Sequence, residues 1–389
     1  MNSHTHTDSN LIESVVELLK TEHWDGLGKL IELLINTAMQ VERQEYLKAS
    51  PYERCVDRVS HANGYKPKTV KTRVGELKLQ VPQTRDGFYP ESLEKGLRSE
   101  RALKLALAQM YLSGTSTRRV AAITQELCGF EVTSEQVSRA TKMLDEQLNA
   151  WRERKLGSYR YIYLDARYEK CRENNQVLDV AVLIAKGINQ QGQREIIGLS
   201  VSLSEAEVHW REFLQSLINR GLSGVELIVS DSHSGLKAAR ASVFPSVPWQ
   251  RCQFHLQQNA QGYAQRKDDK PKIASAIRSI FNAEDIEQAK SLLKAKINAY
   301  EASNPRLSRW LEDNIPEGLT VFQIPEALRR KLRTTNPLER VNKEIKRRTR
   351  VVGIFPNTDA CLRLASALLM EISEDWQSGK AYIDQELLR

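Results

Sequence analysis

The 389 residues of the chain are enough for about two to four domains, and a hydrophobic content of 41% excludes a fibrous or disordered protein. With 57 lysines and arginines against 49 acidic residues, the net charge of +8 gives mild support to a polyanionic partner. The five cysteines are scattered without a C-x-x-C pair, which argues against a disulfide framework and for a reducing compartment. No apolar run is long enough to span a bilayer, so we expect a cytoplasmic protein without a membrane partner.

Residues 1–98 predict a helical region followed by a basic hairpin. Residues 1–10 are polar, and we expect a disordered tail there. From Leu11 to about Ala49 apolar residues recur at helical spacing, and this face predicts a packing or dimer surface.

Two runs of alternating residues, 69–74 and 77–81, flank Gly75-Glu76 and predict a β-hairpin whose turn is that two-residue loop. Basic side chains lie along the hairpin, among them Lys71 and Arg73. They either neutralise DNA phosphates as a β-ribbon or keep an exposed edge strand from aggregating, and the pattern favours neither interpretation.

Residues 99–150 predict a helix-turn-helix DNA-binding domain. Ala102–Leu112 and Thr117–Leu127 form two apolar-rich helices, and a capping-box pattern at Thr133–Gln136 opens a third through Leu148. The outward side chains are of types that read base edges or hold phosphates: Arg118, Arg119, Gln136, Arg139 and Lys142. A plain three-helix bundle gives the same pattern, so the motif gains weight only from the basic hairpin beside it.

Residues 151–256 carry a strand pattern. Three β-rich runs, 159–165, 177–184 and 195–201, predict an antiparallel meander. A capping box at Ser204–Glu207 predicts the next helix, which precedes an apolar strand, a further helix and a short strand. The order β-β-β-α-β-α-β predicts an α/β fold of the ribonuclease H-like type.

Asp165 ends the first of these strands, and Asp231 ends the strand after the first helix. In a ribonuclease H-like sheet these strands are parallel neighbours, so both carboxylates are expected at one edge, where ligands bind. Carboxylates gathered there suit Mg²⁺ or Mn²⁺, and a metal pair about 4 Å apart can clamp a phosphoryl group during in-line displacement. A third carboxylate is still needed. A single aspartate is more often a cap of a strand end or turn, so the pairing carries the argument.

Cys252 and His255 have the spacing of metal ligands but no second pair, which argues against a structural zinc site. We expect His255 to be a polar helper near the active edge, while a histidine at the start of a helix is the ordinary alternative. Residues 257–330 are helical in pattern and predict an all-α insertion, after which residues 331–389 complete the catalytic domain.

The stretch 334–350 predicts one helix, with Asn336 as N-cap and Pro337 in the first turn. A narrow apolar stripe runs along it, and the basic side chains around the stripe would follow a phosphate backbone. These basic residues are Arg340, Lys343, Lys346, Arg347, Arg348 and Arg350. Spacing places Glu339 and Glu344 on opposite flanks of the stripe and leaves both open as third carboxylate, although the helix dipole mildly favours Glu339.

Four motifs occur in order: Tyr163-Leu164-Asp165-Ala166-Arg167, Ser230-Asp231-Ser232-His233, Cys252-x-x-His255 and Thr334-Thr335-Asn336-Pro337-Leu338-Glu339-Arg340. Together, with the helical insertion between the third and the fourth, they resemble the prokaryotic mutator-type insertion-sequence transposases over about residues 35–376.

The resemblance implies a DDE catalytic set of Asp165, Asp231 and Glu339 that holds Mg²⁺, for which Mn²⁺ substitutes, with His255 at the same site. It implies two-metal-ion phosphoryl transfer on double-stranded DNA, with cleavage at terminal inverted repeats and strand transfer to target DNA. We expect a homodimer in the bacterial cytoplasm, nucleoid-associated when bound to DNA. Trp210 or Trp310 could stack on an extruded base, although a core position is the more ordinary role of a tryptophan.

Two other classes stay open from the residues alone. A structure-specific nuclease on the same ribonuclease H-like fold would cleave DNA without joining it. A helix-turn-helix transcriptional regulator would need no metal site at all.

Overall fold

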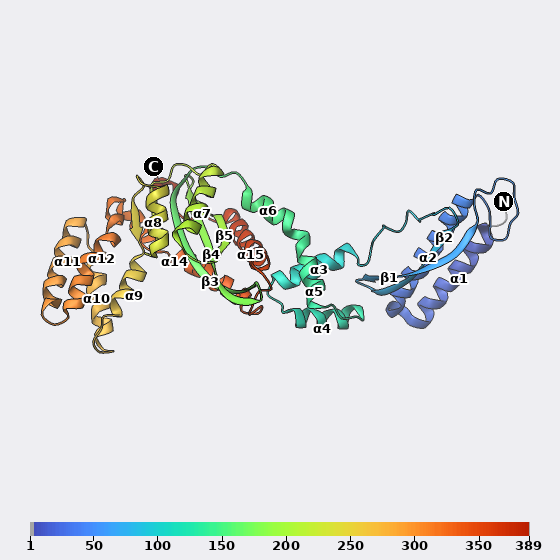
Figure 1. Cartoon of the computed structure of the whole chain (residues 1–389), viewed down its shortest axis with the longest axis horizontal. Helices are drawn as coiled ribbons and strands as arrows, with labels where there is room; N and C mark the ends of the chain where they lie inside the picture. The colour runs from blue at the N-terminus through green and yellow to red at the C-terminus, as the bar shows by residue number, and fades with distance from the viewer. Residues whose placement is uncertain (1–3, 389) are drawn as a thin grey trace. The chain divides into compact units, whose positions relative to one another are not determined.

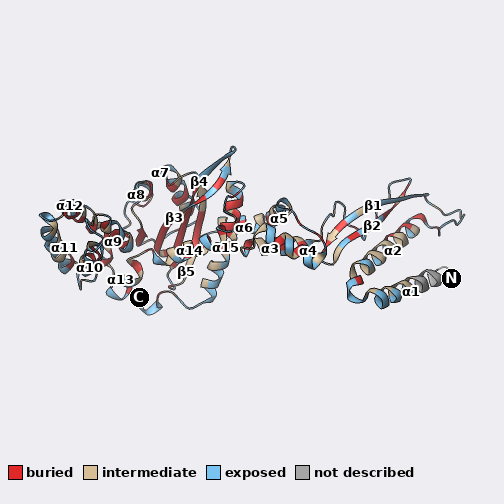
Figure 2. Cartoon of the chain, turned by 90° about the horizontal axis from the view of Figure 1, so that it is seen from below, coloured by how far each residue is buried: buried red, intermediate tan, exposed pale blue. Residues whose placement is uncertain are grey.

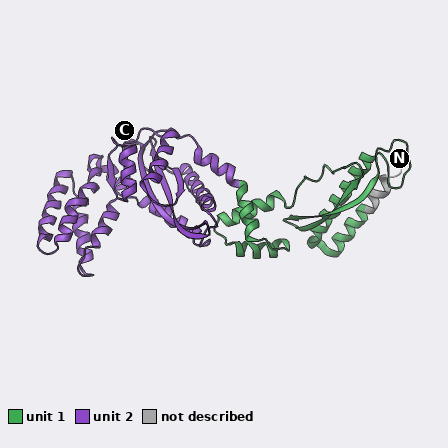
Figure 3. Cartoon of the chain, in the orientation of Figure 1, with its two compact units in different colours: residues 1–143 green, residues 144–389 purple. Residues whose placement is uncertain are grey.

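The computed structural model describes residues 4–388, and the chain forms two compact units, residues 1–143 and 144–389 (Figure 3). Within the described residues no helix is long and apolar enough to cross a membrane.

The first unit opens with α1 (His4–Glu22) and α2 (Leu27–Leu47), joined by the 3-10 turn η1 (His23–Gly26). The disordered tail expected at residues 1–10 is therefore wrong from His4 onward, and residues 1–3 lie outside the described part of the chain. A helix that has already formed can extend through these polar residues, because each added residue gains a backbone hydrogen bond. Relative to alanine, a polar residue lowers helix stability by less than about 1 kcal/mol.

The predicted β-hairpin follows as β1 (Ala62–Thr72) and β2 (Gly75–Thr84), paired antiparallel. The inner face of the hairpin packs on α2 around a small core of Met39, Val70, Leu77, Leu79, Val81 and Leu93. The hairpin thus depends on α2 for its apolar cover.

The turn of the hairpin differs from the prediction. Thr72 pairs with Gly75, so the two loop residues are Arg73 and Val74 rather than Gly75 and Glu76. The Thr72 hydroxyl donates a 2.8 Å hydrogen bond to the carbonyl oxygen of Gly75, and Gly75 has φ of +115°, which favours glycine. Gly75 therefore serves as the first residue of β2, not of the turn.

Three helices occupy the predicted helix-turn-helix segment: α3 (Arg101–Leu112), α4 (Thr117–Cys128) and α5 (Ser134–Thr141). The predicted capping box is formed, since the Thr133 hydroxyl accepts from the Gln136 amide and the Gln136 side chain accepts from the Thr133 amide. The predicted continuation of this helix to Leu148 is wrong.

The continuation is broken at η2 (Lys142–Leu144), beyond which α6 (Asp145–Glu153) begins. The Thr141 hydroxyl donates to the carbonyl oxygen of Ser138 at 2.7 Å, and such local bonds compete with the helical ladder.

The second unit is built on a mixed five-stranded sheet of order β5-β4-β3-β6-β7, of which β3, β4 and β5 are labelled in Figure 1. β3 (Tyr159–Glu173), β4 (Gln176–Asn189) and β5 (Arg194–Ser202) form the predicted antiparallel meander. β6 (Leu227–Ser230) and β7 (Trp249–Arg251) extend the sheet in parallel beside β3. The predicted α/β class is confirmed.

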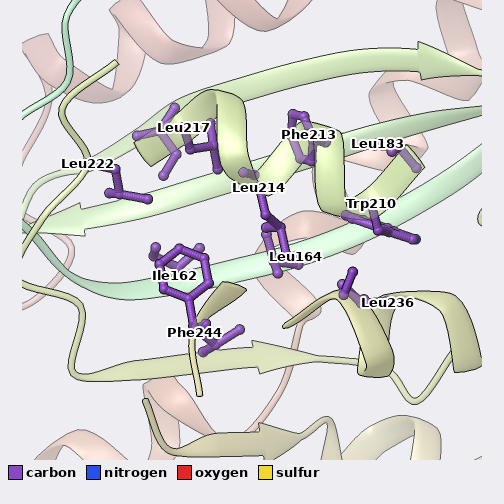
Figure 4. Close-up of a cluster of buried hydrophobic side chains, with 14 of the residues drawn as sticks. Ile162, Leu164, Leu183, Trp210, Phe213, Leu214, Leu217, Leu222, Leu236 and Phe244 are labelled. Atoms are coloured by element: carbon purple, nitrogen blue, oxygen red, sulfur yellow. The ribbon is translucent and has the colours of Figure 1, made fainter. Parts of the chain in front are cut away.

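Alternation along β3 gives its two faces different roles. Ile162 and Leu164 point into an apolar core made with α7 (Glu207–Asn219) and α8 (Ser234–Val243) (Figure 4). This core includes Trp210, Phe213, Leu214, Leu217 and Leu236. The other face is covered by α14 (Asn336–Thr349) and α15 (Thr358–Ser378), so most of the sheet is buried (Figure 2).

The capping box predicted at Ser204–Glu207 is wrong. The N-cap of α7 is Ala206, without a side-chain hydrogen bond, and the Ser204 hydroxyl instead accepts from the Ala206 amide at 3.3 Å. The Glu207 carboxylate pairs with Arg211 one turn later, so it does not return to the N-cap.

Between β7 and α14 every described element is helical. These elements are α9 (Gln253–Gln261), α10 (Asp269–Phe281), α11 (Ile286–Glu301), α12 (Pro305–Asn314), η3 (Ile315–Gly318), η4 (Thr320–Gln323) and α13 (Glu326–Leu332). The last described element is η5 (Gln385–Leu388).

Candidate functional site

Asp165 and Asp231 lie at the same level of two adjacent parallel strands. The last paired residues of β3 and β6 are Tyr163 and Val229, and each aspartate follows two residues later, on the same face of its chain. Neighbouring strands are about 4.8 Å apart, and the negative charge of Asp231 acts on Asp165, so the two carboxylates are neighbours. The prediction that Asp165 ends its strand is wrong, because β3 continues in partnership with β4 to Glu173.

The Asp165 carboxylate is buried, with only 8% of the residue exposed. One oxygen accepts from the Ala166 amide at 2.9 Å, and the other accepts from the Asn342 side-chain amide at 2.9 Å. Burial, reinforced by the negative charge of Asp231, raises the pKa of Asp165 from its ordinary 3.8 to about 7. Burial and the neighbouring carboxylate therefore disfavour the ionised form of Asp165.

Glu205 is a further carboxylate at this edge, which no pattern in the sequence predicts as part of the site. It lies in the loop before α7, is largely buried, and has its Oε2 atom 3.8 Å from Nδ1 of His233. Burial raises the pKa of Glu205, the charge of Asp231 adds to the rise, and His233 opposes it. A Cβ atom at Gly235 would lie 2.1 Å from the carbonyl oxygen of Glu205, so glycine permits this close approach.

Helix α14 is anchored along the face of β3 that carries Asp165. Besides the bond from Asn342 to Asp165, the Arg167 guanidinium donates to the carbonyl oxygen of Asn342 at 2.7 Å. About two turns later the Thr349 hydroxyl donates to Glu169 at 3.0 Å. Alternate residues of β3 thus hold the helix in place beside the carboxylates.

Glu339 and Glu344 have different surroundings on this helix. Oε1 of Glu339 lies 3.8 Å from Nε2 of His255 and is buried without a hydrogen-bond partner. Glu344 instead binds Arg347 at 2.6 and 2.9 Å and Arg348 at 3.1 Å, and these hydrogen bonds lower its pKa to about 2.

The segment before α14 contacts the Cys252 motif. Cys252 is buried, and its Sγ accepts from the amide and the hydroxyl of Thr335 at 3.3 and 3.4 Å. The neighbouring Cys252 side chain, helped by the charges of Asp165 and Asp231 and opposed by burial, raises the pKa of His255 to about 9. The predicted N-cap is wrong by one residue, because Thr335 occupies that position and Asn336 begins the helix.

Among residues 4–388, no three His, Cys, Asp or Glu side chains gather closely enough to hold a metal ion as the chain stands. Asp165 and Asp231 come together, and Glu339 comes to His255 at the same edge. The two pairs interact electrostatically, because the negative charges of both aspartates raise the pKa of His255.

The model of the family described as "Transposase, Mutator family" matches residues 1–379. The chain belongs to this family. A transposase for insertion sequence element IS406 from Burkholderia multivorans is 53% identical, over 97% of this chain and 98% of that protein. The transposase for ISRM5 from Rhizobium meliloti is 42% identical, covering 99% and 97%. The transposase for IS256 in transposon Tn4001 from Staphylococcus aureus is 37% identical, covering 97% of each.

Among solved structures, the chain has a weak likeness to one chain of a viral integration complex. That chain comes from the cryoEM structure of a simian T-cell lymphotropic virus intasome in complex with PP2A regulatory subunit B56 gamma. The match is 12% identical, covers 50% of this chain and 67% of that chain, and has a TM-score of 0.18, too low to bear on the fold.

The basic residues predicted on α14 divide into two groups. Arg340, Lys343, Lys346 and Arg350 are exposed, whereas Arg347 and Arg348 are bound to Glu344. The first group is open to a phosphate backbone on this helix.

In the first unit, Lys71 and Gln136 line one pocket of about 430 Å³ with Lys68 and Arg98. Lys71 also lies over the Phe130 ring at 4.6 Å and 3.6 Å from Glu76.

The other predicted DNA-contacting residues of the first unit are on the surface. Arg73 pairs with Glu100 at 3.1 Å and Arg139 with Glu135 at 2.8 Å, while Arg118, Arg119 and Lys142 are exposed. Of the two predicted stacking candidates, Trp210 is fully buried in the core and Trp310 packs 5.7 Å from Tyr263.

Proposed function

We propose that this transposase cleaves DNA at the ends of an insertion sequence and joins the ends to target DNA, using Asp165, Asp231 and Glu339. The observation that carries the proposal is the placement of Asp165 and Asp231 at one level of two parallel strands, beside the helix that bears Glu339. The names of the relatives, all transposases for insertion sequence elements, support the reaction class.

The sheet order supports a ribonuclease H-like fold for the second unit. Three antiparallel strands are followed, after a helix, by two strands parallel to the first, and helices cover both faces. In such a sheet the carboxyl ends of the central parallel strands are the usual place for a ligand.

The side chains at this edge fit Mg²⁺ as cofactor. Two carboxylates with mutually unfavourable charge and a buried Glu339 oxygen without a hydrogen-bond partner are hard oxygen donors short of a cation. Asp165, Asp231 and Glu339 would hold the metal. When bound, a pair of such ions would supply an activated nucleophile and stabilise charge on the phosphoryl oxygens.

The chain's own residues position these groups. Asn342 orients the Asp165 carboxylate through its 2.9 Å bond, and Arg167 holds Asn342 through the helix backbone. Without a metal, the pKa of His255 is raised to about 9, which favours a protonated ring beside Glu339. A phosphate entering this edge would meet that charge and the exposed cations of α14.

Glu339 is the better third carboxylate of the two on α14. Glu344 is bound by Arg347 and Arg348, and a metal ion would have to displace both guanidinium groups. Glu339 is free of cationic partners other than His255 among the described residues.

The test is a reaction of purified protein with Mg²⁺ and DNA carrying the terminal inverted repeats of its element. We expect the wild type to nick and join this DNA, whereas Asp165→Ala, Asp231→Ala and Glu339→Ala still bind it without reacting. Normal joining by all three variants would refute the catalytic assignment, and end cleavage without joining would indicate a nuclease. The homodimer stays a prediction, which light scattering of the DNA-bound protein checks.

A further inference from the structure

A pocket of about 480 Å³ lies against α14 on the side opposite the carboxylates. Asn336, Pro337, Arg340, Val341 and Glu344 form its α14 wall. At 100° per residue these positions lie about half a turn away from Glu339 and Asn342. We call this cavity the α14 pocket. Because it lies on the opposite side of the helix from Glu339, it is about one helix diameter, roughly 10 Å, from the catalytic edge.

The α14 pocket gathers positive charge from three separate elements. Arg194 on β5, Arg330 and Lys331 on α13, and Arg340 on α14 line it. The one carboxylate in its lining, Glu344, is already bound to Arg347 and Arg348. The excess charge would favour an anion.

Two aromatic rings, those of Trp376 and Tyr382, line another part of the pocket, together with Thr334 and Ile372. The Arg194 guanidinium lies 4.5 Å from the Trp376 ring centre and 5.4 Å from that of Tyr382, and both rings are partly accessible. Behind them Lys186 is fully buried, its Nζ without a hydrogen-bond partner and 4.4 Å from the rings of Tyr163 and Tyr382. Proteins hold single-stranded nucleic acid by stacking bases on aromatic rings while neighbouring cations bind the phosphates, and this pocket offers both kinds of group.

Packing of the C-terminal segment explains only part of this arrangement. The Tyr382 amide donates to the carbonyl oxygen of Gly192 at 2.8 Å, and Lys331 donates to the carbonyl oxygen of Tyr382, so these groups tie the segment to β5. Arg330 and Arg340 make none of the hydrogen bonds that hold the C-terminal segment against β5. Both are exposed, and neither pairs with a carboxylate among the described residues.

We infer that the α14 pocket binds one unpaired nucleotide of the DNA substrate, with its phosphate on Arg194 and Arg340 and its base on Trp376. The inference rests on the proposed function, because it takes DNA as the substrate. The nucleotide would lie within one or two positions of the reacting phosphate, since α14 alone separates the pocket from Glu339. The pocket thereby gives the enzyme a means to hold a frayed strand end.

The probe is a fluorescent duplex of the terminal inverted repeat whose last two nucleotides are unpaired, with 2-aminopurine at one of them. Arg194→Ala is expected to weaken binding about tenfold at 0.1 M salt and to reduce the slope of log affinity against log salt by about 0.7. Trp376→Leu is expected to weaken binding about tenfold without changing the slope, and to abolish the quenching of 2-aminopurine. Arg306→Ala on α12 and Trp151→Leu on α6, whose ring lies 4.8 Å from the Arg154 guanidinium, are the matched controls and should bind as the wild type does.

Trp376→Phe is the conservative variant that separates loss of stacking from misfolding. Because it keeps an aromatic face, it should bind more tightly than Trp376→Leu and nearly as tightly as the wild type. Variants Arg194→Ala and Trp376→Leu that melt like the wild type yet bind with unchanged affinity and quenching would overturn the inference. If those variants also cleave and join normally, only the pocket assignment fails. A wild type that binds the frayed duplex with quenching but never reacts would count against the proposed function and leave the pocket intact.

Discussion

Replacing Asp165 with asparagine is expected to stabilise the metal-free protein, and more at pH 8 than at pH 5. The pKa of Asp165 rises from 3.8 to about 7 on folding, because the carboxylate is buried beside Asp231. The folded state thus binds the proton more tightly than the unfolded state. This acid's contribution to stability is complete below pH 3.8 and is lost as pH rises through 7.

The size of the effect follows from the shift. Compared with a neutral side chain, Asp165 costs at most about 4 kcal/mol at pH 8, where the folded protein holds it ionised, and about 2 kcal/mol at pH 5, where it takes up a proton on folding. Asparagine has one acceptor where the carboxylate accepts two hydrogen bonds, from Ala166 and Asn342, which costs about 1 kcal/mol at either pH. Asp165→Asn should therefore gain about 3 kcal/mol at pH 8 and about 1 kcal/mol at pH 5.

Scanning calorimetry in EDTA at the two pH values measures this difference. For a unit of this size, about 2 kcal/mol corresponds to an extra rise in Tm of roughly 4–8 °C at pH 8. Asp179→Asn, at an exposed aspartate on β4, is the control and should show no such difference. Equal shifts of Tm at both pH values for Asp165→Asn would refute the account of a buried, mutually repelling pair.

Two further substitutions test the surroundings of the site. Asn342→Ala removes the amide that orients Asp165, so we expect end cleavage to fall about 10- to 100-fold with unchanged DNA binding, and excess Mg²⁺ to recover part of the rate. A rate equal to that of the wild type would show that the bond does not position the carboxylate. Gly235→Ala places a Cβ 2.1 Å from a backbone oxygen of Glu205 and should destabilise the second unit by about 1–3 kcal/mol in thermal melts. Gly157→Ala, where a Cβ meets nothing within 4 Å, should leave Tm unchanged, and matching melts for the two variants would contradict the close packing at Gly235.

Strand order was the part of the site that the sequence could predict. Three alternating runs, then a helix and an apolar strand, imply that β6 pairs with β3, and the observed pairing of Tyr163 with Val229 brings Asp165 and Asp231 level. The predicted end of β3 was wrong because the β4 partner continues past Asp165, and the length of a strand depends on its partner as well as on its own residues.

Groups that depend on distant contacts could not be predicted. Glu205 lies in a loop without periodicity, and its backbone packs closely against Gly235 of another element. Thr335 rather than Asn336 is the N-cap of α14, and its hydroxyl is bound by Cys252, which is 83 residues away. The α14 pocket is likewise assembled from β5, α13, α14 and α15. Side-chain environment, not spacing, separates Glu339 from Glu344.

The measurement that tests the central claim most directly is strand joining by Glu339→Gln beside Glu344→Gln, at saturating DNA and Mg²⁺. Both changes remove one carboxylate charge from the same helix, so differences in DNA affinity are small. The account predicts that Glu339→Gln joins no ends while Glu344→Gln joins them at nearly the wild-type rate. Joining by Glu339→Gln at the wild-type rate, or its loss in Glu344→Gln alone, would contradict it.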